Sequence, residues 1–206
     1  MNPFMKHIQI LFLLSFSIVS SAQYDWTNGQ LVLNNGETLN GQIKIPMVSK
    51  NLIAFNGKEK VSYRPNRKSK KVKYGAEQVK LVIFKNSPSE TAYFEYIPVL
   101  ENKKGLFQVI TSGKARLYAR SVSVTSASGP AGGFQVYSFN NFNEYYVIRD
   151  GEELASPMIT ARLSRSFKNR AMEYFSDCLN VVLKLENRIY KKEDIKSVVD
   201  EYNQCE

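Results

Sequence analysis

The sequence predicts an α+β fold, in which mainly antiparallel β structure is followed by a C-terminal helical segment. From residue 30 to about residue 148, short apolar runs recur roughly every ten residues between Gly, Pro, Asn and Asp, which is typical of short strands joined by turns. After Pro157, apolar residues recur at spacings of three and four, the period of an amphipathic helix. Strands first and helices last indicate an α+β chain. We expect about ten strands, arranged as a meander, a sandwich or a small barrel.

The first 22 residues have the layout of a secretory signal peptide. Lys6 supplies an early positive charge, residues 8–19 form an apolar run, and Ser20 and Ala22 are small residues before the expected cleavage point. The run is shorter than the roughly 20 residues that cross a membrane. We therefore expect a mature protein that begins at Gln23, has no transmembrane segment and is soluble in the periplasm or cell envelope. The expected division is a signal peptide at 1–22, an antiparallel β domain at 23–157, and a helical tail at 158–206 packed on it.

The single histidine of the chain, His7, lies in this leader. Without the leader, no imidazole remains for a Ser-His-Asp or Cys-His catalytic unit, or for a His-ligated metal. Most hydrolase and metalloenzyme designs are thereby excluded, and we expect no metal and no cofactor. Paired carboxylates stay open, because glycoside hydrolysis needs no His. The candidates are Glu90, Glu95, Glu101 and Glu144.

The first predicted hairpin joins residues 31–33 to residues 38–45 through Asn35-Gly36. Asn-Gly tolerates positive φ at both central positions of a type I′ turn, so that turn type is predicted here. In the second strand, the odd-numbered residues from Leu39 to Ile45 are apolar or Gly and alternate with polar residues. One face of this strand is therefore expected on the core and the other in water.

Further strands are predicted at residues 52–55, 60–63, 79–84, 91–97, 106–111, 115–120, 134–139, 145–149 and 152–155. The run VKLVIF at 79–84 is apolar on both faces, which predicts a central strand. Asp150-Gly151 is a favoured two-residue turn and is expected to join the last two strands. The segment SASGPAGG at 126–133 has no large side chain to pack, so we interpret it as a flexible connection, with a lid as the alternative.

A single apolar helical stripe is predicted over residues 167–189. It comprises Phe167, Ala171, Tyr174, Cys178, Val182, Leu185 and Ile189, with Phe175 beside it. Ser164 and Ser166 are candidate N-caps, and Asp177 would cap a second helix if the segment breaks there. A last helix is expected from about Asp194. Its predicted buried face is Ile195, Val198, Val199 and Tyr202.

The two cysteines, Cys178 and Cys205, both lie in this helical tail. In an exported protein, two Cys in one small region indicate a disulfide. Closing a loop of roughly thirty residues stabilises the fold by ~3–4 kcal/mol on the chain-entropy estimate. Because the sequence has no C-x-x-C spacing and no activating base, a structural bridge is expected rather than a redox pair.

Residues 60–75, KVSYRPNRKSKKVKYG, carry seven of the 28 Lys and Arg and none of the 19 Asp and Glu. The stretch is predicted to form two strand ends around a hairpin tip that begins at Pro65-Asn66, with Tyr63 and Tyr74 as added ring contacts. Crowded cations attract anionic polymers in a salt-dependent way. The alternative is a solvated tip that keeps an edge strand from pairing. The candidate contact residues are Arg64, Arg67, Lys68, Lys70, Lys71 and Lys73.

Short segments at both ends of the chain resemble uncharacterised exported proteins of Bacteroidetes-type bacteria. The matching segments are SAQ at 21–23, LNNGETLNGQI at 33–43, YFSDC at 174–178 and EYNQC at 201–205. Leu179 follows the first Cys, where that group often has Pro. The resemblance implies an envelope location and a β-rich body, and it implies no activity.

The function expected from these observations is non-enzymatic. We expect an exported protein that binds an anionic envelope lipid or polysaccharide, or another envelope protein, and not nucleic acid. One alternative is a lipocalin-like carrier, which requires an unfilled apolar interior for a small ligand. The other is a carboxylate-dependent glycan hydrolase, which requires two glutamates about 5–10 Å apart across a cleft.

Overall fold

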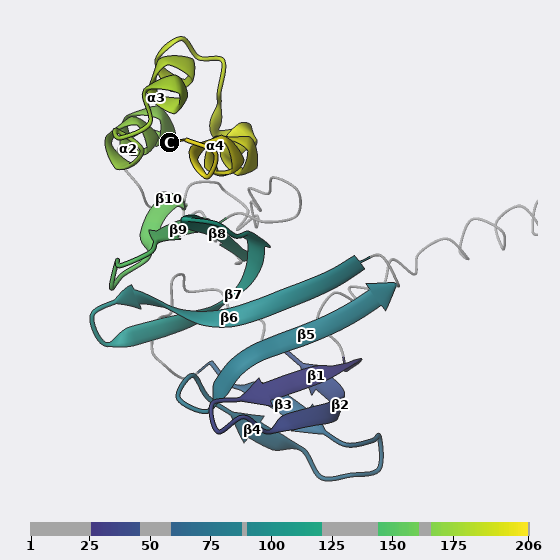
Figure 1. The fold of residues 1–206 in the computed structure, drawn as a ribbon. Helices are drawn as coiled ribbons and strands as arrows, with labels where there is room; N and C mark the ends of the chain where they lie inside the picture. The colour runs from purple at the N-terminus through teal and green to yellow at the C-terminus, as the bar shows by residue number, and fades with distance from the viewer. Residues whose placement is uncertain (1–25, 46–58, 88–89, 121–143, 161–165, 206) are drawn as a thin grey trace, which may run out of the picture.

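The computed structural model describes residues 26–45, 59–87, 90–120, 144–160 and 166–205 of the 206-residue chain. The predicted signal peptide, the predicted strands at 52–55 and 134–139, and the predicted loop at 126–133 lie outside these residues. In the described part, ten strands form one antiparallel sheet and three α-helices follow it, which confirms the predicted α+β fold (Figure 1).

The strands occur in the chain as β1 (Thr27–Leu33), β2 (Thr38–Lys44), β3 (Val61–Arg64), β4 (Val72–Tyr74), β5 (Val79–Ser87), β6 (Glu90–Leu100), β7 (Lys103–Thr111), β8 (Ala115–Arg120), β9 (Glu144–Arg149) and β10 (Ser156–Ile159). Their order in the sheet is β10-β9-β8-β7-β6-β5-β1-β2-β3-β4. The sheet is thus a meander in which β5 pairs with β1 instead of β4. β5 lies in the middle of this order, as its two apolar faces predict.

The N-terminal part of the sheet is curled. β4 lies four strands from β5 in the sheet order, which would be about 19 Å in a flat sheet. Only residues 75–78 connect the two strands, and Gln78 N–H donates to Gly75 O across a turn (3.0 Å). So short a connection requires β5-β1-β2-β3-β4 to bend round towards each other (Figure 1). The concave side is filled by buried apolar side chains, among them Leu31, Ile43, Val61 and Val82.

Two glycines allow the curled strands to pack closely. Gly29 and Gly41 lie opposite each other on β1 and β2. A Cβ on Gly29 would lie 2.6 Å from Ile83 O, and a Cβ on Gly41 would lie 2.5 Å from Arg64 O. Real Cβ atoms do not approach that closely, so only glycine fits either position. Gly41 shares the buried side of β2 with Ile43, as the alternation predicts.

The first hairpin lies where the sequence predicts it, but the predicted type I′ turn is wrong. Gly36 has φ +89°, whereas Asn35 is not among the residues with positive φ. Leu33 O accepts from Gly36 N–H (3.0 Å), and Leu33 N–H donates to Glu37 O (2.8 Å). The loop therefore has three residues and one left-handed glycine, the pattern of a type I turn followed by a bulge.

The predicted last strand at 152–155 is also wrong, because β10 begins at Ser156. Glu152 N–H donates to Arg149 O (3.1 Å) and closes a turn. Ala155 N–H then donates to Pro98 O on β6 (2.8 Å) instead of pairing with β9. β10 (Ser156–Ile159) therefore includes residues 157 and 158, between which the β domain was predicted to end and the helical tail to begin.

The helices are α2 (Phe167–Tyr174), α3 (Leu179–Glu186) and α4 (Ile195–Tyr202), the last preceded by a 3-10 turn (Lys192–Asp194). Ser166 is the N-cap of α2, and its hydroxyl accepts from Asn169 N–H (3.3 Å). Ser164 lies outside the described residues. α3 begins directly after Cys178, so the N-cap position is Cys178 and not the predicted Asp177.

The helices pack on the C-terminal end of the sheet, above β8–β10 in Figure 1. All four residues predicted for the buried face of α4 are buried. The predicted stripe across α2 and α3 is only partly right. The helix ends at Tyr174 and a second helix begins at Leu179, and in α3 the buried residue is Val181 where Val182 was predicted. Ile189 is 63% exposed, since the chain turns away after α3 through Arg188 at φ +57°. None of the described helices is long and apolar enough to cross a membrane.

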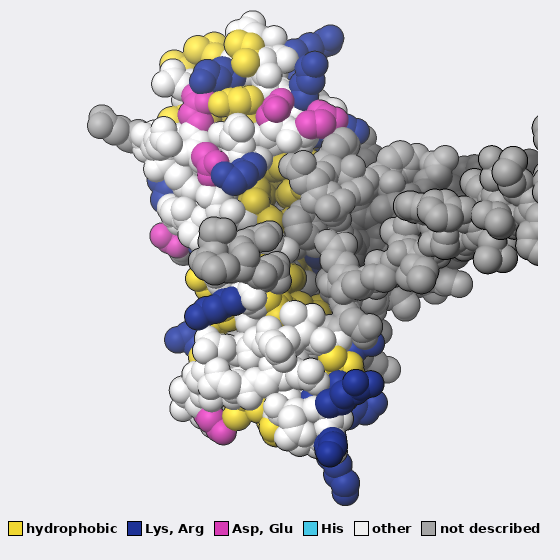
Figure 2. All heavy atoms as spheres, turned by 90° about the vertical axis from the view of Figure 1, so that its right-hand side faces the viewer, with side chains coloured by type: hydrophobic (Ala, Val, Ile, Leu, Met, Phe, Trp, Pro, Cys, Tyr) yellow, Lys and Arg dark blue, Asp and Glu magenta, His cyan; other side chains and the backbone are white. Residues whose placement is uncertain are grey.

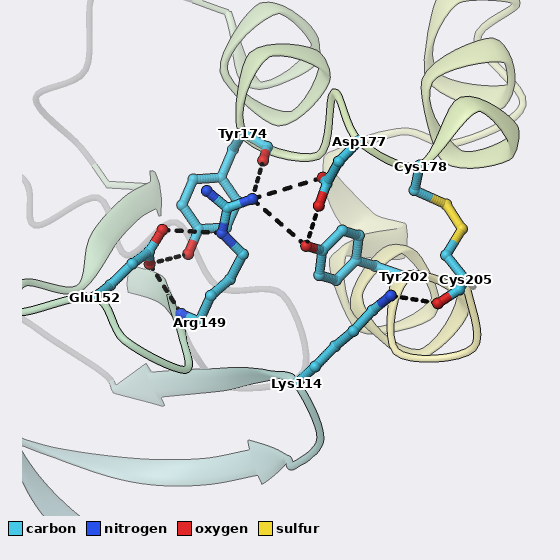
Figure 3. Close-up of polar contacts among 8 residues, drawn as sticks. All are labelled: Lys114, Arg149, Glu152, Tyr174, Asp177, Cys178, Tyr202 and Cys205. Atoms are coloured by element: carbon cyan, nitrogen blue, oxygen red, sulfur yellow. Dashed lines mark hydrogen bonds and ion pairs between the residues drawn. A yellow bond between two sulfur atoms is a disulfide. The ribbon is translucent and has the colours of Figure 1, made fainter.

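Cys178 and Cys205 form the predicted disulfide, with Cα atoms 6.0 Å apart (Figure 3). The bridge joins the start of α3 to the end of the segment that follows α4. Next to it, Lys114 from the β7–β8 turn donates to the carbonyl of Cys205. The end of the chain is thus held both by a covalent bond and by the sheet.

Arg149, at the end of β9, joins the sheet to the turn between α2 and α3 (Figure 3). Its Nε donates to Glu152 Oε1 (2.9 Å), and its Nη1 donates to Tyr174 O (3.2 Å) and lies 3.6 Å from Asp177 Oδ1. Burial alone would raise the pKa of Glu152, but hydrogen bonds from Arg149 and Tyr174 and the charge of Arg149 outweigh it and lower this pKa. Glu152 is therefore stabilised as a carboxylate.

Candidate functional site

The basic stretch folds into a hairpin of β3 and β4, in which Val61 pairs with Tyr74 and Tyr63 pairs with Val72. β4 is the last strand in the sheet order, so this hairpin lies at an edge of the sheet. We call its six predicted contact residues the basic hairpin: Arg64, Arg67, Lys68, Lys70, Lys71 and Lys73.

Asn66 fixes the turn at the tip of the hairpin, which was predicted to begin at Pro65-Asn66. Its side-chain oxygen accepts from Lys68 N–H (3.0 Å), and its carbonyl accepts from Ser69 N–H (3.2 Å). An Asn side chain that bonds the backbone two residues on is a common way to start a turn. Arg67 and Lys68 are consequently the two central residues of the turn, and both are exposed.

The charges of the basic hairpin are not neutralised locally. Apart from Arg64, its members are exposed, and no ion pair joins any of the six to a carboxylate within the described residues. Figure 2 shows Lys and Arg side chains at both ends, but Asp and Glu side chains lie mainly at the upper, helical end, so few carboxylates accompany the cations at the lower end, which carries β1–β4. The molecule therefore presents a positive end in the part that the structure describes.

Arg64 differs from the other members because neighbouring side chains hold it in place. Its Nε donates to Gln42 Oε1 (2.8 Å), and its guanidinium carbon lies 4.1 Å from the centre of the Trp26 ring. Its Nη1 also reaches Arg67 O at 3.5 Å. A planar guanidinium fixed in this way retains outward donors in the geometry that suits a carboxylate or phosphate.

The two tyrosines predicted to add ring contacts are occupied within the fold. Tyr63 is 8% exposed, donates its hydroxyl to Asn40 O (3.0 Å) and packs edge-on against Tyr74. Burial, with smaller contributions from Tyr74 and Glu37, raises the pKa of Tyr63. These rings thus pack on the core side of the hairpin, and the cationic side chains, apart from that of Arg64, remain exposed.

The carboxylates considered for hydrolysis have structural partners or lie apart. Glu144 is 2% exposed and pairs with Arg120 Nε at 2.7 Å. Glu95 accepts from the Tyr118 hydroxyl (2.9 Å), and Glu101 is exposed in the β6–β7 turn. The side chain of Glu90 lies outside the described part. These contacts argue against a reactive pair among the described glutamates.

Arg120 has a second buried carboxylate beside it. Its Nη1 lies 3.5 Å from Glu59 Oε1, and Glu59 is only 9% exposed. Burial raises the pKa of Glu59, the charge of Arg120 and a backbone hydrogen bond from Leu106 oppose this, and Glu144 adds to it. Two carboxylates thus share one guanidinium in the interior, an arrangement that the sequence did not reveal.

A surface groove lies between α3 and α4 beside the disulfide. It has a volume of about 930 Å³, and its lining includes Asp177, Lys184, Asp200 and Glu201. These polar walls do not suit a small apolar ligand, and the concave side of the curled sheet is packed with side chains. Both observations argue against a lipocalin-like carrier. Within the described ranges, His, Cys, Asp and Glu form no group of three that could hold a metal ion.

Comparison with protein-family models, with curated proteins and with solved structures gives no match.

The basic hairpin is visible in the sequence, but its support by Trp26 and Gln42 was not predicted. Trp26 immediately precedes β1, and Gln42 lies on β2, opposite Arg64. The clue available in the sequence was the alternation of β2, which places Gln42 on the outward face; the pairing of β2 with β3 was needed to bring it to Arg64.

Proposed function

We propose that this protein is an exported, non-enzymatic binding protein that contacts an anionic component of the cell envelope through the basic hairpin. The observation that carries the proposal is a set of six cations on one edge hairpin with no carboxylate partner among the described residues. A cluster of this kind raises the local potential and concentrates anionic polymers or surfaces.

Two features support an envelope location within the proposal. The first 22 residues have the layout of a signal peptide, and Cys178 and Cys205 form a disulfide, which persists in oxidising compartments. In that setting nucleic acid is not the partner, and phosphorylated or carboxylated envelope polymers fit the charge of the hairpin.

The test is a binding measurement with a fourfold variant, in which Arg67, Lys68, Lys70 and Lys71 are changed to Ser. These four side chains are exposed and support no described contact of the core, so the variant is expected to keep its fold. Binding to dextran sulfate and to vesicles that contain phosphatidylglycerol is measured at low ionic strength. We expect the variant to lose at least about tenfold in affinity for each polyanion that the wild-type protein binds.

The matched control changes four exposed cations elsewhere, Lys80, Lys103, Arg188 and Lys191, to Ser. It removes the same net charge, so it separates a local site from general attraction by a basic protein. Equal losses in the two variants, or no binding of either polyanion by the wild-type protein, would contradict the proposal.

A further inference from the structure

The outward face of β1–β3 carries amide and cationic side chains in regular cross-strand rows. Gln30 lies opposite Asn40 in one row, and Asn28, Gln42 and Arg64 form the next. In the third row, Ser62 lies between Lys44 and Lys73. Rows on one face of a strand are about 7 Å apart. We call this surface the amide face: Asn28, Gln30, Asn40, Gln42, Arg64 and Lys73.

The amide face points away from the core. Its members alternate along the strands with Leu31, Ile43 and Tyr63, which are buried on the concave side. On an ordinary solvated strand face, Thr or β-branched residues would be favoured, and Asn is among the residues depleted from strands. Two Asn within strands, beside two Gln and with no Asp or Glu in the three rows, are therefore better explained by a binding role than by strand stability.

Contacts within the face hold its side chains in place. Gln30 Nε2 donates to Asn40 Oδ1 (2.9 Å), and Arg64 Nε donates to Gln42 Oε1 (2.8 Å). Each amide has more donor and acceptor sites than these bonds use, and Arg64 has further N–H donors. The face thus offers paired donors and acceptors at its centre and cations at one side.

An exposed aromatic ring lies at the other side of the same surface. The row of Asn40 and Gln30 continues across β5 through Ile83 to Tyr93 on β6. Tyr93 is 43% exposed. An aromatic ring supplies apolar contact area with a polar hydroxyl at its edge.

We propose that the amide face binds an acidic polysaccharide, in which sugar hydroxyls bond the amide side chains and carboxylates pair with Arg64 and Lys73. Amides match hydroxyl groups because both donate and accept, and a guanidinium matches a carboxylate through two parallel hydrogen bonds. This inference rests on the proposed function of the basic hairpin and names its ligand class. A membrane surface would attract the cations but would leave the amide rows without a role.

The test uses protein produced from the full chain, with polygalacturonate as the carboxylated polysaccharide and uncharged dextran and phosphatidylglycerol vesicles as comparison probes. The variant combines Asn40→Thr with Gln42→Thr, which removes both amides, keeps the net charge and raises the strand propensity. The control is Gln108→Thr on β7, the same chemical change outside the face. Asn28→Thr is a second, milder variant at the same surface.

The expected result is that the wild-type protein and Gln108→Thr bind polygalacturonate equally, while the Asn40/Gln42 variant binds at least about tenfold more weakly. Its binding to vesicles should equal that of the wild-type protein.

If the double variant fails to show cooperative thermal unfolding, Asn28→Thr is expected to give a smaller loss of polygalacturonate affinity. Retention of full polygalacturonate affinity by the folded amide variants would overturn the inference, as would a preference for vesicles over polygalacturonate. The fourfold Lys/Arg variant tells the two proposals apart: if it alone loses binding, the basic hairpin is the site and the amide face is not.

Discussion

The guanidinium of Arg64 lies over the ring of Trp26, with its central carbon 4.1 Å from the ring centre. Trp26 is the single tryptophan of the chain. Because Arg64 belongs to the basic hairpin and also lies opposite Gln42, this contact places a natural fluorescent probe beside the candidate site.

Binding of an anionic polymer should therefore change the emission of Trp26. An anion that pairs with Arg64 alters the charge and solvation next to the ring, so we expect a shift or intensity change that saturates with ligand. In Arg64→Ala the ring loses its cover, and its emission should move to longer wavelength before any ligand is added. Arg67→Ala is the control and should keep the wild-type spectrum. Identical spectra for the free and ligand-saturated wild-type protein would show that the anion does not reach Arg64.

The Cys178–Cys205 disulfide should contribute substantially to stability. The bridge spans 27 positions in the sequence, and loop-closure entropy predicts a loss of about 3–4 kcal/mol when it is removed. We expect the Cys178→Ser/Cys205→Ser variant to unfold at a correspondingly lower urea concentration than the oxidised wild-type protein, and reduced wild-type protein to behave like the variant. Equal midpoints with and without reductant would show that packing of α3 and α4 suffices.

Glu59 should make the protein less stable as the pH rises. Its pKa is raised in the folded state, mainly by burial, so the folded protein holds this proton more tightly than the unfolded chain. The stability gained from the bound proton is full below the unfolded pKa of 4.5 and disappears as the pH rises through the folded pKa. Glu59→Gln should therefore be more stable than wild type at neutral pH, with Arg120 still paired to Glu144, and the difference should shrink below pH 4.5. Urea unfolding across this pH range provides the measurement, and a variant less stable than wild type at neutral pH would contradict this account.

Glu152 should show the opposite pH dependence. Its pKa is lowered in the folded state, so its contribution is present above the unfolded pKa of 4.5 and is lost as the pH falls through the folded pKa. Glu152→Gln weakens the bond to Arg149, and we expect it to cost about 1–2 kcal/mol at neutral pH and progressively less in acid. Glu153→Gln, at the exposed neighbouring position, is the control and should have little effect. A loss for Glu152→Gln that is independent of pH would point to packing instead of charge.

The sequence alone predicted the features that depend on local pattern. The alternation in β2 and the buried face of α4 follow from residue periods, and the central place of β5 follows from the apolar residues on both of its faces; the structure confirms all three. The pairing of Cys178 with Cys205 followed from their number and compartment.

The features that the sequence analysis missed depend on contacts between distant segments. β10 begins later than predicted because Ala155 N–H donates to Pro98 O on β6. The alternation of side chains along a strand does not show which distant strand its backbone bonds. The break after α2 is stabilised by Arg149 from the sheet, and residues 174–178 alone carry no strong stop signal. At the candidate site the cations were visible in the sequence, whereas the support of Arg64 by Trp26 and Gln42 required the pairing of β2 with β3.

The salt dependence of polyanion binding tests whether the basic hairpin is the anion-binding site. It is compared between the wild-type protein and the variant with Arg67, Lys68, Lys70 and Lys71 changed to Ser. If these cations contact the ligand, the logarithm of the wild-type association constant should fall linearly with the logarithm of the salt concentration. The slope for the variant should be shallower by about two to four, since each lost cationic contact releases roughly one counterion fewer. Parallel lines for the two proteins would contradict the claim that the basic hairpin is the anion-binding site.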